Sequence, residues 1–130
     1  GEVNFPTYLW ADDSELLVTD SLNFRVQRFG AGGAFRASFG KNGDRAGDFA
    51  RPKGVAVDSE GHVYVVDALF NGIQVFDRDG RLLLAFGEQG QQPGQFWLPN
   101  GLFITADDLI FVADSYNRRV QVFRYLGSAS

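Results

Sequence analysis

Short runs of alternating or β-branched apolar residues, separated by polar turns, dominate the chain. The clearest set of four runs occupies 54–58, 62–67, 72–77 and 81–87. A short connection ending in Gly61 separates the first two runs, and one ending in Gly80 separates the last two. Glycine accepts the positive φ that tight hairpin turns need. Because no stretch carries the apolar stripe of a helix, the pattern predicts four short antiparallel strands.

The same pattern recurs along the chain at a step of 47 residues. Three residue types mark this step in triplicate: Asp20, Asp67 and Asp114; Gln27, Gln74 and Gln121; Phe29, Phe76 and Phe123. Pro6, Pro52 and Pro99 are instead spaced by 46 and 47 residues, so the first repeat is one residue shorter near its start. Two places fit this deletion, either before Tyr8 or in the turn at Asp12–Glu15.

Repeats of about 40–50 residues with four antiparallel strands each are typical of β-propeller blades. The repeated phenylalanines fit this fold. Phe29, Phe76 and Phe123 end the third strands, and Phe39 and Phe86 end the fourth strands. A ring at these places can fill the wedge between neighbouring blades, where its burial contributes roughly 1.5–3 kcal/mol. We therefore expect these rings in the core and not against a ligand.

The repeat resembles the NHL family of β-propellers. Four segments carry the resemblance: Arg51–Asp58, Val63–Asp67, Asp114–Phe123, and the linker from Phe86-Gly87 to Pro93–Phe96. The resemblance implies an all-β chain of four-stranded antiparallel blades, and it implies the C-terminal half of a six-bladed propeller. It does not specify an activity, because one fold hosts many functions.

One departure from the family pattern concerns an arginine before the third strand. The family's Asn-x-Arg appears as Asn23-Phe24-Arg25 and as Asn117-Arg118-Arg119, whereas the second unit reads Phe70-Asn71-Gly72. We expect Asp20 to pair with Arg25, and Asp114 with Arg119, as structural contacts that close a turn. The middle unit cannot repeat this pair.

The repeats divide the chain into three predicted blades. Residues 1–126 form one three-blade unit, with blades at about 5–49, 50–96 and 97–126, and 127–130 form a linker or tag-like tail. The last blade has three strands. Blades expose apolar flanks unless a neighbour covers them, and the terminal repeats here carry no polar cap. We therefore expect a homodimer of two half-rings; an excised or engineered half of a longer propeller is a compatible origin.

Composition narrows the classes of function. The chain has 130 residues, 45% of them hydrophobic, with no Cys and one His. These counts exclude thiolate sites and multi-histidine metal centres. The net charge of −4 disfavours a nucleic-acid partner, although some NHL proteins bind RNA on one face. No window is apolar for the length of a membrane helix, so we predict no membrane partner.

Few residues suggest catalysis. His62 opens a strand, and the acidic pairs Asp12-Asp13 and Asp107-Asp108 lie in turns, where solvated hairpin residues are expected rather than calcium ligands. We therefore predict a non-enzymatic protein without a cofactor. The alternative is a calcium-dependent hydrolytic propeller similar to lactonases or lyases. In that case Asn100 would point into the channel, but Thr7 and Lys53 occupy the matching places, so no acidic ring is formed.

One propeller face collects large apolar residues in turns that usually hold small polar ones. Such clusters, with aromatic residues and arginine, are typical of protein-binding surfaces. We therefore predict a face that binds a protein or peptide, formed by Leu22, Phe24, Lys53, Leu69, Phe70, Asn100, Tyr116 and Arg118. The alternative is that the apolar side chains in these turns fold down onto the next blade.

Overall fold

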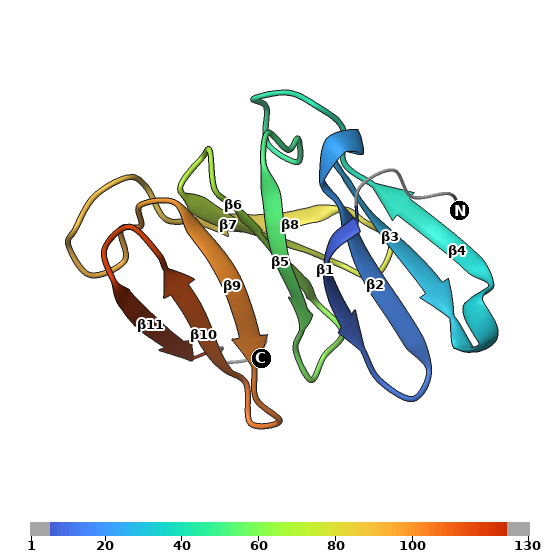
Figure 1. Ribbon diagram of the computed structural model, residues 1–130. Coiled ribbons are helices and arrows are strands. Elements are labelled where there is room, and N and C mark those ends of the chain that lie inside the picture. Colours follow the sequence, from blue (N-terminus) through green and yellow to red (C-terminus); the bar gives the residue numbers. More distant parts are fainter. Residues whose placement is uncertain (1–5, 125–130) are drawn as a thin grey trace.

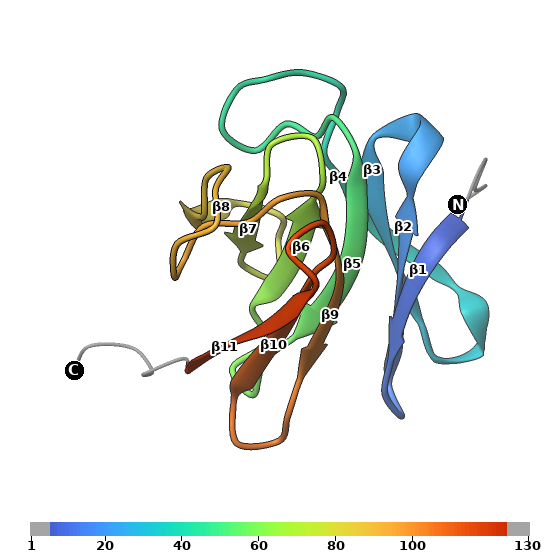
Figure 2. The ribbon, with the colours of Figure 1, turned by 60° about the vertical axis from the view of Figure 1, so that its left-hand side comes forward.

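The computed structural model describes residues 6–124, and within this range the chain forms three antiparallel sheets and no α-helix. In Figures 1 and 2 the first strands of the three sheets lie side by side, and the other strands of each sheet fan outward from them. This arrangement confirms the predicted all-β fold of propeller blades with four, four and three strands.

Each sheet follows the order of its strands in the sequence, from the centre outward. The first blade consists of β1 Pro6–Ala11, β2 Glu15–Asp20, β3 Arg25–Gly30 and β4 Phe35–Phe39. Two short 3-10 turns, Ser21–Asn23 and Ala31–Gly33, connect its strands. The middle blade consists of β5 Pro52–Val57, β6 Val63–Asp67, β7 Gly72–Phe76 and β8 Leu82–Phe86. The third blade consists of β9 Pro99–Ile104, β10 Leu109–Asp114 and β11 Arg119–Arg124.

The strand register locates the one-residue deletion of the first repeat. Leu9 pairs with Val18, as Val55 pairs with Val65, so β1 and β5 are equivalent with a step of 46 residues. The connection from β1 to β2 is 12–14, whereas 58–62 connect β5 to β6. The deletion therefore lies in the turn at 12–14. There the Asp12 carboxylate accepts the Ser14 and Glu15 N–H groups at 2.8 and 2.9 Å and closes the shorter turn.

Two apolar clusters hold the blades together, one at each junction. At the first junction the Phe76 ring lies 4.8 Å from Phe39 and 5.7 Å from Phe49, measured between centroids. At the second junction the Phe123 ring lies 5.4 Å from Phe86. These contacts confirm the predicted wedge-filling role for Phe39, Phe76, Phe86 and Phe123. Phe29 lies at no junction between the described blades and contacts Phe35 instead.

Some sequence-based predictions fall on residues outside 6–124. These are the tail at 127–130 and the two ends of the three-blade unit, 1–5 and 125–126. Among the elements that the structure does describe, none is a helix with the length and apolarity to cross a membrane.

Candidate functional site

The predicted binding face is formed by the turns between second and third strands. Leu22, Leu69, Tyr116 and Arg118 are exposed on these turns, and Phe70 is partly exposed. They therefore offer apolar and cationic groups to solvent, in the combination that the sequence predicted.

Phe24 differs from the other apolar residues of the predicted binding face because its side chain is not exposed. It occupies a left-handed position with φ of 55°, and Asn71 and Arg118 hold the equivalent positions at 54° and 56°. Its ring is half-buried and packs against the cluster between the first and middle blades. For Phe24 the structure thus matches the alternative, in which the side chain folds down onto the next blade.

Lys53 and Asn100 lie near the central line of first strands. Each is the second residue of its strand, β5 or β9, and each is half-buried. The Lys53 carbonyl accepts a hydrogen bond from the Thr19 hydroxyl at 2.7 Å, which ties the first blade to the middle one. Lys53 and Asn100 therefore lie next to the line of first strands, while the apolar residues of the predicted binding face lie farther from it.

Sequence reasoning missed one aromatic contact on this face. The Tyr116 ring stacks on Trp97, with centroids 4.7 Å apart and planes 28° from parallel. The Tyr116 N–H also donates to the Trp97 carbonyl at 3.0 Å. Trp97 belongs to the linker before β9, so the contact joins residues distant in sequence. The signal available was a tryptophan next to Phe96 in a linker that is otherwise rich in glycine and glutamine.

The expected Asp–Arg pairs form in the first and third blades. Arg25 Nη2 lies 3.2 Å from Asp20 Oδ2, and Arg119 Nε lies 2.8 Å from Asp114 Oδ2. Burial by itself raises the pKa of the Asp114 carboxyl, but hydrogen bonds from the Trp97 N–H, from Asn117 and from Arg119 outweigh it. The pKa of Asp114 therefore lies below its ordinary value, and the carboxylate is charged at neutral pH.

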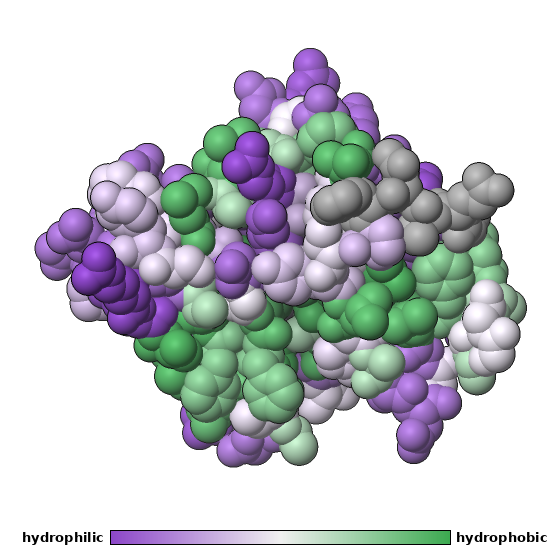
Figure 3. All heavy atoms as spheres, in the orientation of Figure 1, coloured by the Kyte–Doolittle hydropathy of each residue, from purple (hydrophilic) through white to green (hydrophobic). Residues whose placement is uncertain are grey.

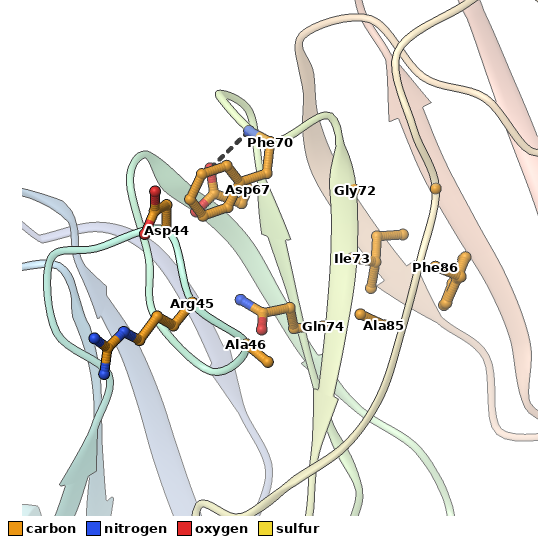
Figure 4. Close-up of a pocket in the computed structure, with 11 residues that line it drawn as sticks. Asp44, Arg45, Ala46, Asp67, Phe70, Gly72, Ile73, Gln74, Ala85 and Phe86 are labelled. Atoms are coloured by element: carbon orange, nitrogen blue, oxygen red, sulfur yellow. Dashed lines mark hydrogen bonds between the residues drawn. The ribbon is translucent and has the colours of Figure 1, made fainter.

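The middle blade replaces this pair with backbone contacts and a cavity. Asp67 accepts the N–H groups of residues 50, 51, 69 and 70 at 2.8–3.2 Å. Gly72 stands where the other blades carry arginine, and beside it lies a cavity of about 190 Å³ (Figure 4). The sequence showed that the arginine was missing, but it did not show the space left behind.

The candidate catalytic groups have structural partners. His62 Nδ1 and the Tyr64 hydroxyl both lie 3.0 Å from Asp58 Oδ2, which fixes the histidine at the start of β6. Asp108 accepts the Ser59 N–H at 2.8 Å and so links two neighbouring turns. Within residues 6–124, no three or more His, Asp or Glu side chains gather closely enough to hold a metal ion.

Radial antiparallel sheets of four, four and three strands, with apolar junctions between them, define the class of this protein as a β-propeller. The family model named NHL repeat matches residues 49–76 and 96–123, that is, from the end of the first linker to the end of β7 and from Phe96 to Phe123. Two NHL repeats are therefore present in the chain, as its motifs predicted. No curated protein sequence matches it.

Solved structures share the fold at low sequence identity. A putative exported protein from Bacteroides fragilis is 17% identical, with a TM-score of 0.70 over 95% of this chain and 36% of that one. A catalytically inactive virginiamycin B lyase from Staphylococcus aureus with quinupristin is 14% identical, with a TM-score of 0.62 over 93% and 41%. Hydrazine synthase from Kuenenia stuttgartiensis is 17% identical, with a TM-score of 0.63 over 95% and 36%. The chain thus spans about two fifths of these proteins, and the similarity concerns the fold alone.

Proposed function

We propose that this chain is a non-enzymatic propeller module that pairs with a second copy to close a six-bladed ring. In the proposed ring, the face of exposed turns binds a protein or peptide. The observation that carries the first part is the apolar character of the two outer blade faces. We call the face of a blade toward the preceding blade its leading face, and the opposite one its trailing face.

The trailing face of the third blade repeats a face that is buried in the middle blade. Ile73 and Val75 of the middle blade are 1% and 3% exposed against the third blade. Their equivalents Val120 and Val122 are 61% and 52% exposed. Figure 3 shows apolar side chains gathered over β9 and β10 of this third blade. Exposed apolar side chains gathered on one sheet face favour an interface.

The leading face of the first blade shows the same contrast. Leu9 is 67% exposed, whereas its equivalent Val55 is 3% exposed at the first junction. Phe35 is also exposed, next to Phe29 at a centroid distance of 6.0 Å. At both observed junctions a leading face packs on a trailing face. The uncovered leading face of the first blade and the uncovered trailing face of the third blade are therefore complementary to each other.

A second copy supplies both missing neighbours at once. Placing the first blade of one chain on the third blade of the other generates two identical junctions around a two-fold axis. The result has six blades, within the range of about 4–8 that closed propellers use. Further blades of a longer chain would cover the same faces, so the solution mass of the 130-residue chain distinguishes the two arrangements.

The mass test uses the purified chain at micromolar concentration. We expect light scattering or sedimentation to give about twice 14.3 kDa. Val122→Asp places a charge on the trailing face and should yield a folded monomer. Leu83→Asp places the same charge on an exposed apolar residue of β8, away from both outer faces, and should remain dimeric. A wild-type chain that is folded and monomeric would contradict the self-association.

The binding part of the proposal is supported by exposed Leu22, Leu69 and Tyr116 beside a cationic Arg118. Selection from a displayed random-peptide library tests it. We expect enriched peptides whose binding is lost in Leu69→Ser combined with Tyr116→Ser, while the mass of the assembly is unchanged. Peptides that bind both proteins equally would place the binding surface elsewhere. Calcium-dependent hydrolytic activity would contradict the non-enzymatic assignment.

A further inference from the structure

The cavity of the middle blade lies between the first linker and the end of β6. Asp44, Arg45 and Ala46 of the linker line one side, and Asp67 and Phe70 line another (Figure 4). The three linker residues are exposed, so a ligand can enter from solvent. The floor includes Gly72, which has no side chain to fill the space.

The third blade shows what occupies the equivalent space. There the Arg119 guanidinium donates to the carbonyl groups of Gln91, Gln92 and Gln95 at 2.8, 3.0 and 2.9 Å. Its Nε donates to Asp114 at 2.8 Å. One side chain thus satisfies a carboxylate and three backbone acceptors, in the planar fork geometry that a guanidinium provides.

The middle blade keeps these acceptors without the arginine. At the 47-residue step, the three carbonyl groups correspond to those of Asp44, Arg45 and Asp48, and the carboxylate corresponds to Asp67. The linker turn is also the same, because Asp48 N–H donates to the Arg45 carbonyl as Gln95 N–H does to that of Gln92, both at 2.9 Å. The linker turn that holds the Arg119 guanidinium is thus repeated here, and Asp44, Arg45 and Asp67 of the corresponding set line the cavity.

Charge favours a cation in this cavity. Asp67 is 1% exposed and, among residues 6–124, no cationic side chain lies within ion-pairing distance of it. Asp44 adds a second carboxylate to the lining. The Arg45 side chain extends away from Gln74 in Figure 4 and leaves the space open.

The geometry points to a recognition site in this cavity for the side chain of an arginine in a partner peptide. The guanidinium takes the place of the absent arginine of the middle blade, pairing with Asp67 and the linker carbonyl groups. Phe70 stands where the other blades have Asn23 and Asn117 and adds an aromatic ring to the lining, a favourable contact for a guanidinium. A lysine ammonium fits less well, because it is a point charge that cannot contact a carboxylate and several carbonyl groups in one plane.

This inference rests on the peptide-binding part of the proposed function, and it names the residue that the peptide must carry. It is independent of the closure of the ring, because every lining residue belongs to one chain. It is also independent of the exposed residues Leu69 and Tyr116, which do not line the cavity. Its failure is therefore distinguishable from failure of either part of the proposed function.

In the test, the full chain is titrated with methylguanidinium and, separately, with methylammonium at constant ionic strength. Binding is measured from the changes in backbone amide NMR shifts. We expect saturable shifts at Asp67, Phe70 and Gly72 with methylguanidinium, and roughly tenfold weaker binding of methylammonium. Gly72→Arg should fill the cavity from within and abolish the shifts. Gly72→Ala is the matched control and should keep them. Both variants place a Cβ at about the same 3.0 Å from the Phe86 carbonyl oxygen, so their difference reports the effect of the arginine side chain beyond Cβ.

Two further comparisons decide the outcome. Gly72→Arg should melt at a higher temperature than Gly72→Ala, because it restores the contacts of the third blade. A capped tripeptide with a central arginine should bind more tightly than free L-arginine; the reverse order would overturn the assignment to a peptide. The absence of saturable shifts in the wild-type chain, which needs no variant to fold, would overturn the guanidinium site itself.

Discussion

The middle and third blades present nearly the same side chains on their trailing faces, but in different surroundings. Ile73 and Val75 are buried, whereas Val120 and Val122 are more than half exposed. The sequences of these strands do not explain the difference, because both place β-branched residues on the same side. The neighbouring blade explains it. In a radial fold, each blade supplies only one half of a junction, and its burial depends on what stands next to it.

The same two blades differ in how they hold their buried aspartate. In the third blade Asp114 contacts an arginine, while in the middle blade Asp67 contacts backbone N–H groups and borders a cavity. Both carboxylates are accommodated, so the fold tolerates loss of the arginine. The two blades differ in the space beside the carboxylate, and the proposed arginine side chain would bind in the space that the middle blade leaves open.

The largest effect is expected from a substitution at the junction between the first and middle blades, where both blade faces are buried. Phe76→Ala should lower the free energy of unfolding by about 4 kcal/mol, because the ring is 1% exposed between Phe39 and Phe49. Phe29→Ala alters the equivalent ring on the uncovered leading face and should mainly weaken dimer formation. Urea unfolding at two protein concentrations measures both. Equal, concentration-independent losses would contradict the proposed second copy.

A smaller effect is expected from the arginine of the third blade. Arg119→Ala leaves Asp114 buried without its cation and should lower the free energy of unfolding by about 2 kcal/mol, since the arginine is itself partly exposed. Arg124→Ala, at an exposed end of β11, is the control and should change stability by less than about 0.5 kcal/mol. A loss no larger than that of the control would show that Asp114, like Asp67, does not need an arginine partner.

Phe24 and Leu22 give a similar contrast within one turn. Phe24→Ser should lower the free energy of unfolding by roughly 1–2 kcal/mol, because the half-buried ring packs on the first junction. Leu22→Ser should be nearly neutral for stability because Leu22 is exposed. Thermal unfolding of the two variants measures the difference. Similar melting temperatures would place Phe24 back among the exposed residues of the binding face.

The smallest expected effect is on the pH dependence of the free energy of unfolding. Because the pKa of Asp114 is lower in the folded chain, its contribution is present above the ordinary carboxyl pKa of about 3.9 and is lost as pH falls through the folded value. Stability should therefore decline below about pH 4, and Asp114→Asn should flatten part of that decline. Asp13→Asn is the control. Urea midpoints between pH 3 and pH 7 test this, and parallel profiles for wild type and Asp114→Asn would contradict it.

Much of this protein follows from its sequence, because periodic patterns report local structure directly. The alternation of apolar residues determined the strands, the 47-residue step determined the blades, and the positions of Phe76 and Phe123 determined that rings fill the wedges. The Asp20–Arg25 and Asp114–Arg119 pairs were also predictable, since each spans one short turn and needs no distant partner.

Tertiary structure alone decided the features that depend on distant segments. The turn at 12–14 could be identified as the shorter one only from the strand register, and Phe24 could be placed only once the middle blade stood beside it. The cavity near Gly72 required the linker at 44–46 to meet the end of β6, more than twenty residues farther along the chain. A side chain's neighbours across a blade junction are not encoded in its own strand, so a missing arginine becomes a possible binding site only in three dimensions.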